Sequence, residues 1–272
     1  MDFICPKCHL PLVTGEGGAA VCAAGHSYDR ARAGYYNLLL GAGGGTHGDN
    51  RDMVEARRAF LSGGYYRPLA EEIASLALKY CPAGGLVLDA GCGEGYYTDT
   101  VERALLCRDG ISRVMAFDIS KDAVRAVARK NNRISLAVGG SYSMPVADGA
   151  LELVLNTFSP LALSEVTRVL KRGGVFIFVY PAEEHLFELK AAIYDTPYKN
   201  TPEDTHLSGL THVETKRLTF KMTFDSEDAI RNLFMMTPYA YRTSEKGRAR
   251  VLNLNRLDCT ADFYIGIYKK DN

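Results

Sequence analysis

The 272-residue sequence predicts an α/β fold, a doubly wound and mostly parallel sheet preceded by a small cysteine-containing N-terminal module. Three observations carry this prediction. Short apolar segments alternate with helical patterns through the middle of the chain, which is typical of parallel strands joined by right-handed crossovers. The first apolar segment ends in an acidic residue followed by three glycines at alternate positions, between Asp89 and Gly95. Three of the seven cysteines lie within residues 1–36.

The expected elements follow the chain in order. Two helices precede the sheet, one from Asp49 to Leu61 and one from Tyr65 to Tyr80 with an apolar face. Strands are expected at 86–90, 113–118, 133–138, 151–156 and 174–180, and the intervening helices at 96–107, 121–131, 160–170 and 183–194. The rhythm then changes to a strand, a helix and a final strand, at His212–Phe224, Asp225–Met236 and Asp262–Lys269.

The chain divides by composition into three parts. Residues 1–36 form the N-terminal module, 37–64 a glycine-rich linker with a lid helix, and 65–272 the α/β domain. A hydrophobic content of 47% is ample for a buried core, and Lys+Arg equals Asp+Glu at 32 each. A neutral chain offers no general attraction for nucleic acid, so any RNA site must be a local basic patch.

The same composition predicts a cytoplasmic protein. The N-terminal residues lack the basic flank and long apolar core of a signal peptide. The longest apolar run, Val175 to Tyr180, is too short to span a bilayer. An odd number of cysteines, two of them in a CxxC pair, indicates a reducing compartment rather than a disulfide framework.

The N-terminal module carries a metal-binding pattern. Cys5-x-x-Cys8 is followed, after thirteen residues, by Cys22-x-x-x-His26. Tetrahedral zinc takes four such ligands, and pairs of ligands on tight turns are the usual way to supply them. Because no ligand position is left open, we expect one structural zinc per chain. The alternatives are buried free thiols with a chance CxxC, or His9 as a competing ligand.

The glycine run predicts a ligand-binding turn, since glycine lets the backbone bend tightly and approach a ligand closely. Its spacing, Gly91-x-Gly93-x-Gly95, differs from the dinucleotide pattern G-x-G-x-x-G. Asp118 ends the second strand, where nucleotide-binding folds place a carboxylate that binds ribose hydroxyls. The alternative is that Asp118 or Ser120 caps the helix that follows.

In its order of strand, Asp, spaced glycines and helix, this loop resembles the cofactor loop of class I S-adenosylmethionine (AdoMet)-dependent methyltransferases. By that resemblance Asp89 either orients the glycine loop or contacts the methionine amine. Residues 139–145 lack the acidic residue that reads the adenine amino group in many relatives, so Ser141, backbone groups or apolar walls would hold adenine. The final strands would be the antiparallel sixth and seventh of a seven-stranded Rossmann-like methyltransferase sheet.

Nearly the whole chain resembles one family, the RlmA-type 23S rRNA guanine-N1 methyltransferases. The zinc ligands share this resemblance with several short motifs, namely Gly34–Leu39, Gly48-Asp49, Ala56–Leu61, Gly64–Leu69, Gly91–Thr98, His185–Lys190 and Met236–Pro238. The resemblance implies that the substrate is a guanine in a hairpin loop of domain II of 23S rRNA, gripped partly by the zinc module of a homodimer. It also implies cofactor contacts by Tyr66, Gly93, Glu94 and His185.

The catalytic and RNA-binding candidates are less sharply defined by the sequence. Methyl transfer is an in-line displacement, and guanine N1 must also lose a proton. In the loop after the fourth strand, Asn156 or the Phe158 face could hold the base, or Asn156 could simply cap that loop. Asp49 and Asp52 in the lid are alternative bases. Arg57 and Arg58 are the best candidates for the basic patch, although a salt-bridged surface is equally open.

Two rival functions remain at the level of the sequence. One is methylation of a small molecule or a protein, with a purely structural zinc knuckle. The other is a zinc-dependent RNA-binding protein with a decayed methyltransferase domain, which the intact glycine loop and Asp118 disfavour. Labelled AdoMet and total RNA would separate these readings by where the label appears.

Overall fold

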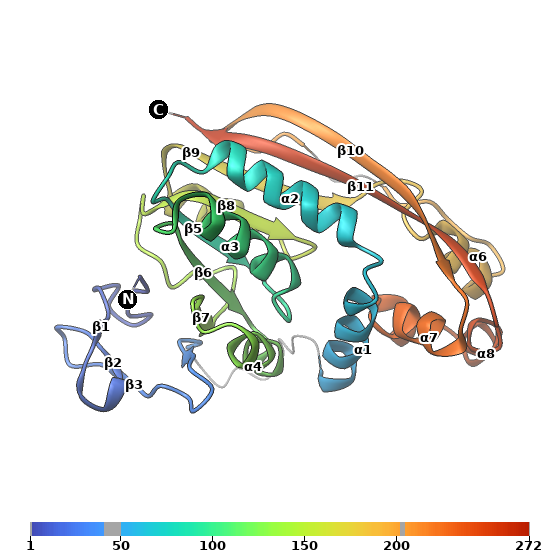
Figure 1. Ribbon diagram of the computed structural model, residues 1–272, viewed down its shortest axis with the longest axis horizontal. Coiled ribbons are helices and arrows are strands. Elements are labelled where there is room, and N and C mark those ends of the chain that lie inside the picture. The colour runs from blue at the N-terminus through green and yellow to red at the C-terminus, as the bar shows by residue number, and fades with distance from the viewer. Residues whose placement is uncertain (1, 41–49, 202–204, 272) are drawn as a thin grey trace.

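The computed structural model describes residues 2–40, 50–201 and 205–271. Its centre is an eight-stranded sheet in the order β10-β11-β9-β8-β5-β6-β7-β4 (Figure 1). The strands of the predicted sheet are β5 (Leu86–Ala90), β6 (Arg113–Asp118), β7 (Ser135–Val138), β8 (Leu151–Thr157), β9 (Leu170–Pro181), β10 (Leu210–Phe224) and β11 (Leu257–Lys270). β4 to β9 pair in parallel, whereas β11 runs antiparallel to both of its neighbours. The doubly wound fold class is confirmed.

Helices cover both faces of this sheet because its central strands are apolar on both sides. In β5, Leu86, Leu88 and Ala90 belong to one apolar cluster and Val87 to the other, as the alternation of a strand requires. The helices are α1 (Arg51–Ser62), α2 (Arg67–Tyr80), α3 (Tyr96–Asp109), α4 (Lys121–Lys130), α5 (Leu163–Val169), α6 (Phe187–Ile193), α7 (Glu227–Met235) and α8 (Glu245–Leu252). The first four pack in the cluster of Val87, and α5 packs in the other.

Local hydrogen bonds explain where the expected boundaries shift. α1 begins after the N-cap Asn50, whose side chain accepts from the Met53 amide, rather than at Asp49. α6 begins at Phe187, later than residue 183, because the preceding segment bonds to β11 through the Ala182 and Leu186 amides. β11 begins at Leu257, earlier than residue 262, because the hairpin with β10 extends its pairing to Phe224.

The sequence predicted seven strands in the main sheet, whereas the structure has eight. The extra strand is β4 (Tyr36–Asn37), which pairs in parallel with β7 at the edge of the sheet. A two-residue strand is too short to produce a periodic pattern, so the sequence gives no signal for it. Its pairing covers the open edge of β7 and joins the N-terminal module to the α/β domain.

The N-terminal module is a small three-stranded sheet packed against the end of the main sheet. It consists of β1 (Val13–Thr14), β2 (Ala20–Val21) and β3 (Ser27–Tyr28), with a 3-10 turn η1 (Glu16–Gly18). Phe3 and Leu12 of the module share one apolar cluster with Met115 and Phe117 of β6. The module and the domain therefore share a continuous core.

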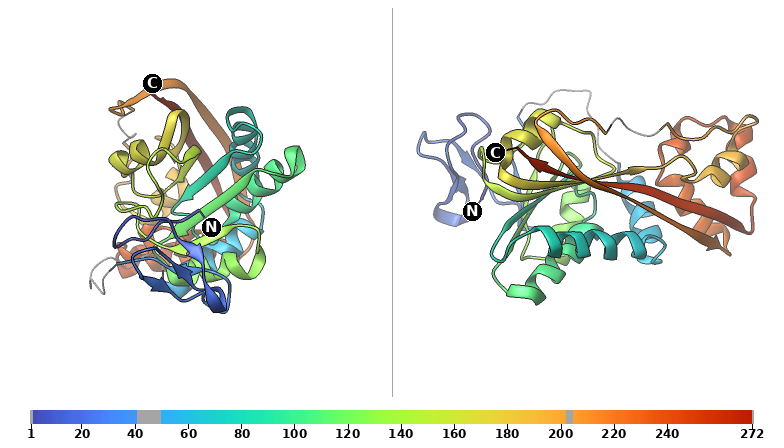
Figure 2. Two further views of the ribbon diagram at one scale, coloured as in Figure 1. Left: turned by 90° about the vertical axis from the view of Figure 1, so that its left-hand side faces the viewer. Right: turned by 90° about the horizontal axis from the view of Figure 1, so that it is seen from above.

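A second group of helices lies at the opposite end of the molecule from the zinc-binding module (Figure 2). The long strands β10 and β11 extend to this end, where α6, α7 and α8 pack together. α8 and the 3-10 turn η2 (Pro238–Tyr241) lie in a stretch for which the sequence predicted no element. In the described residues, no helix combines the length and apolarity needed to cross a membrane.

Candidate functional site: a zinc cluster and a cofactor cavity

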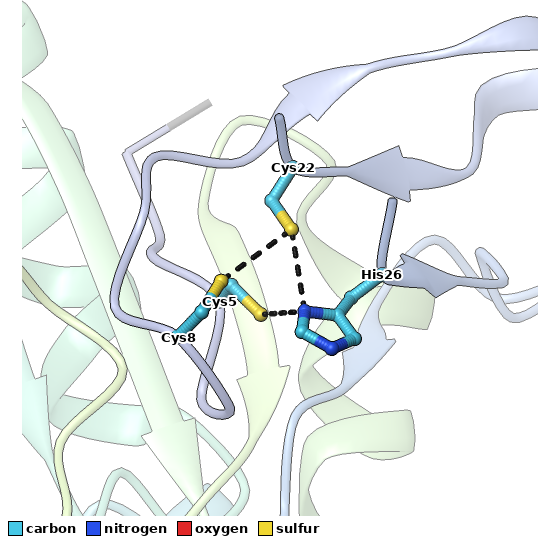
Figure 3. Close-up of side chains that lie close together, drawn as sticks. All are labelled: Cys5, Cys8, Cys22 and His26. Atoms are coloured by element: carbon cyan, nitrogen blue, oxygen red, sulfur yellow. Dashed lines mark hydrogen bonds between the residues drawn. The ribbon is translucent and has the colours of Figure 1, made fainter. Parts of the chain in front are cut away.

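The four predicted metal ligands converge on one point of the N-terminal module. The ligand atoms of Cys5, Cys8, Cys22 and His26 all lie within 4.8 Å of one another (Figure 3). The Nδ1 atom of His26 is 3.4 Å from Cys5 Sγ and 3.5 Å from Cys22 Sγ, and the sulfurs of Cys8 and Cys22 are 3.6 Å apart. His9 lies outside this cluster, on the exposed side of the loop.

These distances fit a tetrahedral zinc ion. With Zn–S near 2.3 Å and Zn–N near 2.0 Å, the edges of a tetrahedron are about 3.5 Å between nitrogen and sulfur and about 3.8 Å between two sulfurs. The Tyr28 hydroxyl lies 3.2 Å from Cys5 Sγ and can donate to it. Although burial opposes ionisation, hydrogen bonds led by the one from Tyr28 lower the pKa of Cys5 to about 6, which favours the thiolate that zinc requires. The cluster is a structural zinc site.

A cavity of about 1010 Å³ opens at the carboxyl ends of the parallel strands, which is where doubly wound folds bind their ligands. Eight of the nine residues predicted to bind the cofactor line it, namely Tyr66, Asp89, Gly91, Gly93, Glu94, Asp118, Ser141 and His185. The exception is Gly95. A Cβ atom there would lie 2.8 Å from Val127 of α4, so Gly95 serves the packing of α3 on α4.

The other two glycines of the loop have different surroundings. Both have positive φ, +85° at Gly91 and +53° at Gly93. A Cβ atom on Gly91 would lie 2.1 Å from Ser159 Oγ, whereas the nearest atom to one on Gly93 would be Arg57 Nη1 at 3.8 Å. The backbone at Gly93 is therefore open towards the cavity.

Asp118 organises this loop from the next strand. Its Oδ2 accepts a 2.9 Å hydrogen bond from the Gly93 amide, and its Oδ1 accepts one of 2.7 Å from the Ser120 amide. Ser120, not Asp118, caps α4 by accepting from the Ala123 amide. Asp118 therefore fixes the glycine loop relative to the start of α4, and its side chain lines the cavity.

Asp89 is a buried carboxyl group of the cavity whose pKa is strongly raised. Its side chain is 1% exposed, and Oδ2 accepts a 2.6 Å hydrogen bond from Thr98. Oδ1 has no hydrogen-bond partner among the described residues. Burial, together with the charges of Asp118 and Glu94, raises the pKa of Asp89 to about 7. A ligand ammonium group would satisfy the Oδ1 atom and favour the ionised carboxylate, so the residue fits the amine of AdoMet.

Tyr66 and His185 form a buried, hydrogen-bonded pair that also lines the cavity. His185 Nδ1 accepts from the Asp262 amide at 3.3 Å, which places the ring proton on Nε2. Nε2 therefore donates to the Tyr66 hydroxyl, 3.3 Å away, and leaves the Tyr66 proton free to donate in turn. Burial lowers the pKa of His185 to about 3, so this ring is neutral and a poor base at physiological pH.

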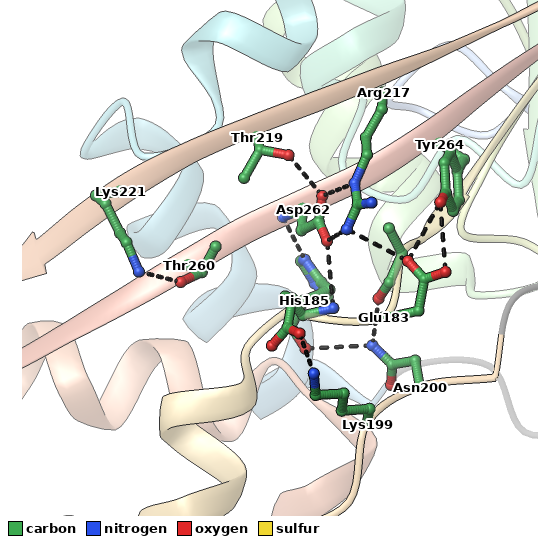
Figure 4. A network of polar contacts seen from close by, with 12 residues as sticks. Glu183, His185, Lys199, Asn200, Arg217, Thr219, Lys221, Thr260, Asp262 and Tyr264 are labelled. Carbon is green, nitrogen blue, oxygen red and sulfur yellow. Dashed lines mark hydrogen bonds and ion pairs between the residues drawn. The ribbon is translucent and has the colours of Figure 1, made fainter.

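A polar network holds His185 in place (Figure 4). Asp262 is fully buried and accepts hydrogen bonds from Arg217 Nε at 2.9 Å and from Thr219 Oγ1 at 2.6 Å. Asn200 donates to the carbonyl oxygens of Ala182 and His185 at 2.8 and 3.2 Å. The sequence showed no periodic or motif signal for Asp262 or Asn200, because their partners are far apart in the chain.

Neither Asn156 nor Asp52, the two polar catalytic candidates that the structure describes, lines the cavity. Asn156 is fully buried, donates to the Pro160 carbonyl and accepts from the Ser159 amide, both at 3.2 Å. This is the loop-capping alternative, and Asn156 does not line the cavity. Asp49 lies outside the described residues, and Asp52 is exposed on α1 away from the cavity lining.

The two arginines proposed for RNA binding lie on different sides of α1. Arg57 lines the cavity above Gly93, and its guanidinium donates to the Met236 carbonyl at 3.4 Å. Arg58 is exposed on the outer side of α1. Met236, which Arg57 contacts, belongs to the Met236–Pro238 motif singled out in the sequence, and this motif also lines the cavity.

Comparisons with known proteins place this architecture in a class. A methyltransferase-domain model matches residues 88–178, and a model of the RlmA N-terminal zinc ribbon matches residues 3–40. A crystal structure of a methyltransferase-like protein from Bacillus halodurans C-125 covers 74% of this chain and 100% of its own, with a TM-score of 0.50 and 17% identity. The protein is an AdoMet-dependent methyltransferase with an N-terminal zinc ribbon.

Sequence relatives narrow the class further. A 23S rRNA (guanine(748)-N(1))-methyltransferase of Streptomyces fradiae is 38% identical over 70% of this chain and 66% of its own length. A Bacillus subtilis (strain 168) protein assigned as a 23S rRNA (guanine-N(1)-)-methyltransferase is 30% identical over 98% of this chain and 97% of its own. The chain belongs to the family of 23S rRNA guanine-N1 methyltransferases.

Proposed function

We propose that the protein transfers the methyl group of AdoMet to N1 of a guanine in the domain II hairpin loop of 23S rRNA. The observation that carries this proposal is that the cofactor loop and the loop after β8 open into one cavity. A methyl donor and a flat nucleobase can therefore meet in the same chamber. The names of the Streptomyces and Bacillus relatives support the choice of guanine N1.

When bound, AdoMet supplies a sulfonium-activated methyl group. In the transfer, the N1–C bond forms as the C–S bond breaks, and the N1 proton leaves to solvent. The carboxylates that line the cavity, Asp89, Glu94 and Asp118, all come from the cofactor side, and His185 is neutral with Nδ1 already occupied. Catalysis then rests mainly on alignment of N1, methyl and sulfur rather than on a strong base.

The arrangement of the zinc module supports a role in RNA binding. Pro6, which lies between the ligands Cys5 and Cys8, and Leu38–Leu40, which follow the module, line the same cavity as the cofactor residues. An RNA hairpin that delivers a base to this cavity would contact the module directly. The family resemblance also implies that the protein forms a homodimer, which would shape the RNA cleft. Sedimentation of the purified protein would test whether it is a dimer. A substrate in the ribosome implies a cytoplasmic site of action.

The test is the distribution of label from methyl-labelled AdoMet. The protein is incubated with total cellular RNA, a protein extract and small metabolites, and each fraction is separated and counted. Label in 23S rRNA supports the proposal. Label confined to protein or small molecules would instead favour the rival methyltransferase activity with a purely structural zinc module.

A further inference from the structure

The last residue of β8, Thr157, carries a buried hydroxyl group that nothing in the described chain satisfies. Thr157 is 8% exposed and lines the cavity. Its Oγ1 atom has no hydrogen-bond partner within the described residues. A buried hydroxyl without a partner is costly, so its presence in a ligand cavity indicates that a ligand satisfies it.

The next residue presents an aromatic ring to the same cavity. Phe158 is 43% exposed and has a φ of +60°, a left-handed conformation that a bulky residue rarely adopts. Asn156 holds it there, because its side chain bonds to both the Ser159 amide and the Pro160 carbonyl. The loop is therefore built to hold the Phe158 ring partly exposed at the cavity, at the cost of backbone strain.

The surroundings of Phe158 suit a flat ligand. Its ring centroid lies 6.4 Å from those of Tyr66 and Tyr97, and its plane is within 20° of the His185 ring. Rings gathered in this way leave an apolar face on which another ring can stack.

The position of the loop in the sheet separates it from most of the cofactor residues. In the strand order, β8 lies on one side of β5, while β6 and β7 lie on the other. Asp118 and Ser141, which would contact the ribose and adenine, follow β6 and β7. Ser159 touches the glycine loop at Gly91, so the loop after β8 borders the cofactor site without being part of its nucleoside end.

We propose that Thr157 and Phe158 together form the site of the target guanine. The Phe158 ring stacks on the base, and the Thr157 hydroxyl donates a hydrogen bond to guanine O6. That bond strengthens as N1 loses its proton, because the charge left behind is shared with O6. This inference rests on the proposed function, which supplies the guanine and its methylated position.

The test compares four variants with the wild type on a 23S rRNA hairpin transcript, with AdoMet affinity measured separately by calorimetry. Thr157→Val should lower kcat about tenfold, the effect of one lost hydrogen bond. Thr157→Ser should restore most of it. Phe158→Leu should raise the KM for RNA at least tenfold, as the loss of one stacking contact does. Thr215→Val, an exposed threonine of β10, is the matched control and should change nothing. The AdoMet Kd should stay within twofold of the wild-type value throughout.

Two results would overturn the inference while leaving the proposed function intact. One is a Thr157→Val variant that loses AdoMet affinity but keeps its kcat, since the hydroxyl would then serve the cofactor. The other is a Phe158→Leu variant with an unchanged KM for RNA. If the wild-type protein itself methylates no guanine in the transcript, the proposed function fails first, and the inference fails with it.

Discussion

At the scale of the residue, the cavity contains buried polar atoms that have no hydrogen-bond partner in the described chain. Asp89 shows this most clearly, because its Oδ1 atom is buried without a partner in the described chain and its pKa is raised to about 7. The sequence predicted Asp89 as a cofactor residue but left its role open. Only the folded chain shows that Thr98 occupies one oxygen and leaves the other for a ligand.

This raised pKa predicts a pH dependence of cofactor binding. Below pH 7 the Asp89 carboxyl group is mostly protonated in the free protein, and binding of an ammonium group must first expel that proton. We expect AdoMet affinity to fall about fivefold between pH 7 and pH 6 and to level off above pH 8. Calorimetry across this range tests it, with Asp89→Asn as the variant that should bind weakly and without this dependence. A wild-type affinity that is flat from pH 8 to pH 6 would contradict the assignment.

The glycine loop predicts a sharp contrast between two substitutions. Gly91→Ala places a Cβ atom 2.1 Å from Ser159 Oγ, inside the cofactor loop, so AdoMet affinity should fall more than tenfold. Gly110→Ala, at a similar positive φ of +68° after α3, meets nothing closer than 4.0 Å and should cost only about 1 kcal/mol of stability. Thermal melting and AdoMet titration of both variants separate the two effects. Equal losses of affinity would show that the loss is due to general strain.

Residue roles that depend on long-range neighbours could not be predicted from the sequence. Asn156 and Arg57 illustrate this limit, because the sequence left open whether Asn156 caps its loop and whether Arg57 is structural. Asn156 bonds within its own loop, and Arg57 lies in the cofactor cavity beside residue 236 rather than in an outer basic patch. By contrast, the four zinc ligands lie within 22 residues of one another in sequence, and their spacing alone identified them.

At the scale of the element, strands that are buried on both faces were predictable and short or irregular segments were not. β5 and β6 match their predicted bounds because each contains an apolar run, Leu86–Leu88 and Val114–Phe117, that is followed by an aspartate. β4 is two residues long, and η2 and α8 lie in a polar stretch with little periodicity. These elements depend on contacts with the rest of the fold, so no local pattern marks them.

The zinc module is the element whose removal is most informative. Cys22→Ser should abolish the binding of one zinc ion per chain, as measured by metal analysis of the reduced protein. Because Phe3 and Leu12 share a core with β6, the loss should also lower the melting temperature of the whole protein, on the order of 5 °C. Cys107→Ser, an exposed cysteine of α3, is the matched control and should retain zinc. A Cys22→Ser protein that still holds one zinc would show that the ligand set is wrong.

At the scale of the whole molecule, the cavity collects contributions from segments that are far apart in the chain. The zinc module, the lid helix α1 and the turn after α7 all reach the mouth of a site centred on the parallel sheet. The chain is electrically neutral, with 32 basic and 32 acidic residues, so RNA binding must depend on a few exposed cations.

Arg58 is an exposed cation of α1 that does not line the cavity, and its role can be tested separately from that of Arg57. Arg58→Ala should weaken RNA binding and reduce the slope of its salt dependence by about one, while AdoMet affinity stays unchanged. Arg57→Ala should instead weaken AdoMet binding, because its guanidinium lies over Gly93. Salt titrations of RNA affinity and calorimetry with AdoMet distinguish the two. An unchanged slope in a well-folded Arg58→Ala protein would rule out contact with phosphate.

The central claim is that this cavity methylates one guanine of 23S rRNA at N1. Reverse transcription of domain II after incubation with AdoMet tests it most directly, because a methyl group on N1 blocks base pairing and stops the enzyme. The account predicts one new stop at a single guanine of the hairpin loop, present with the wild-type protein and absent with Gly91→Ala. Incorporation of label into the same RNA without any stop at a guanine would contradict it.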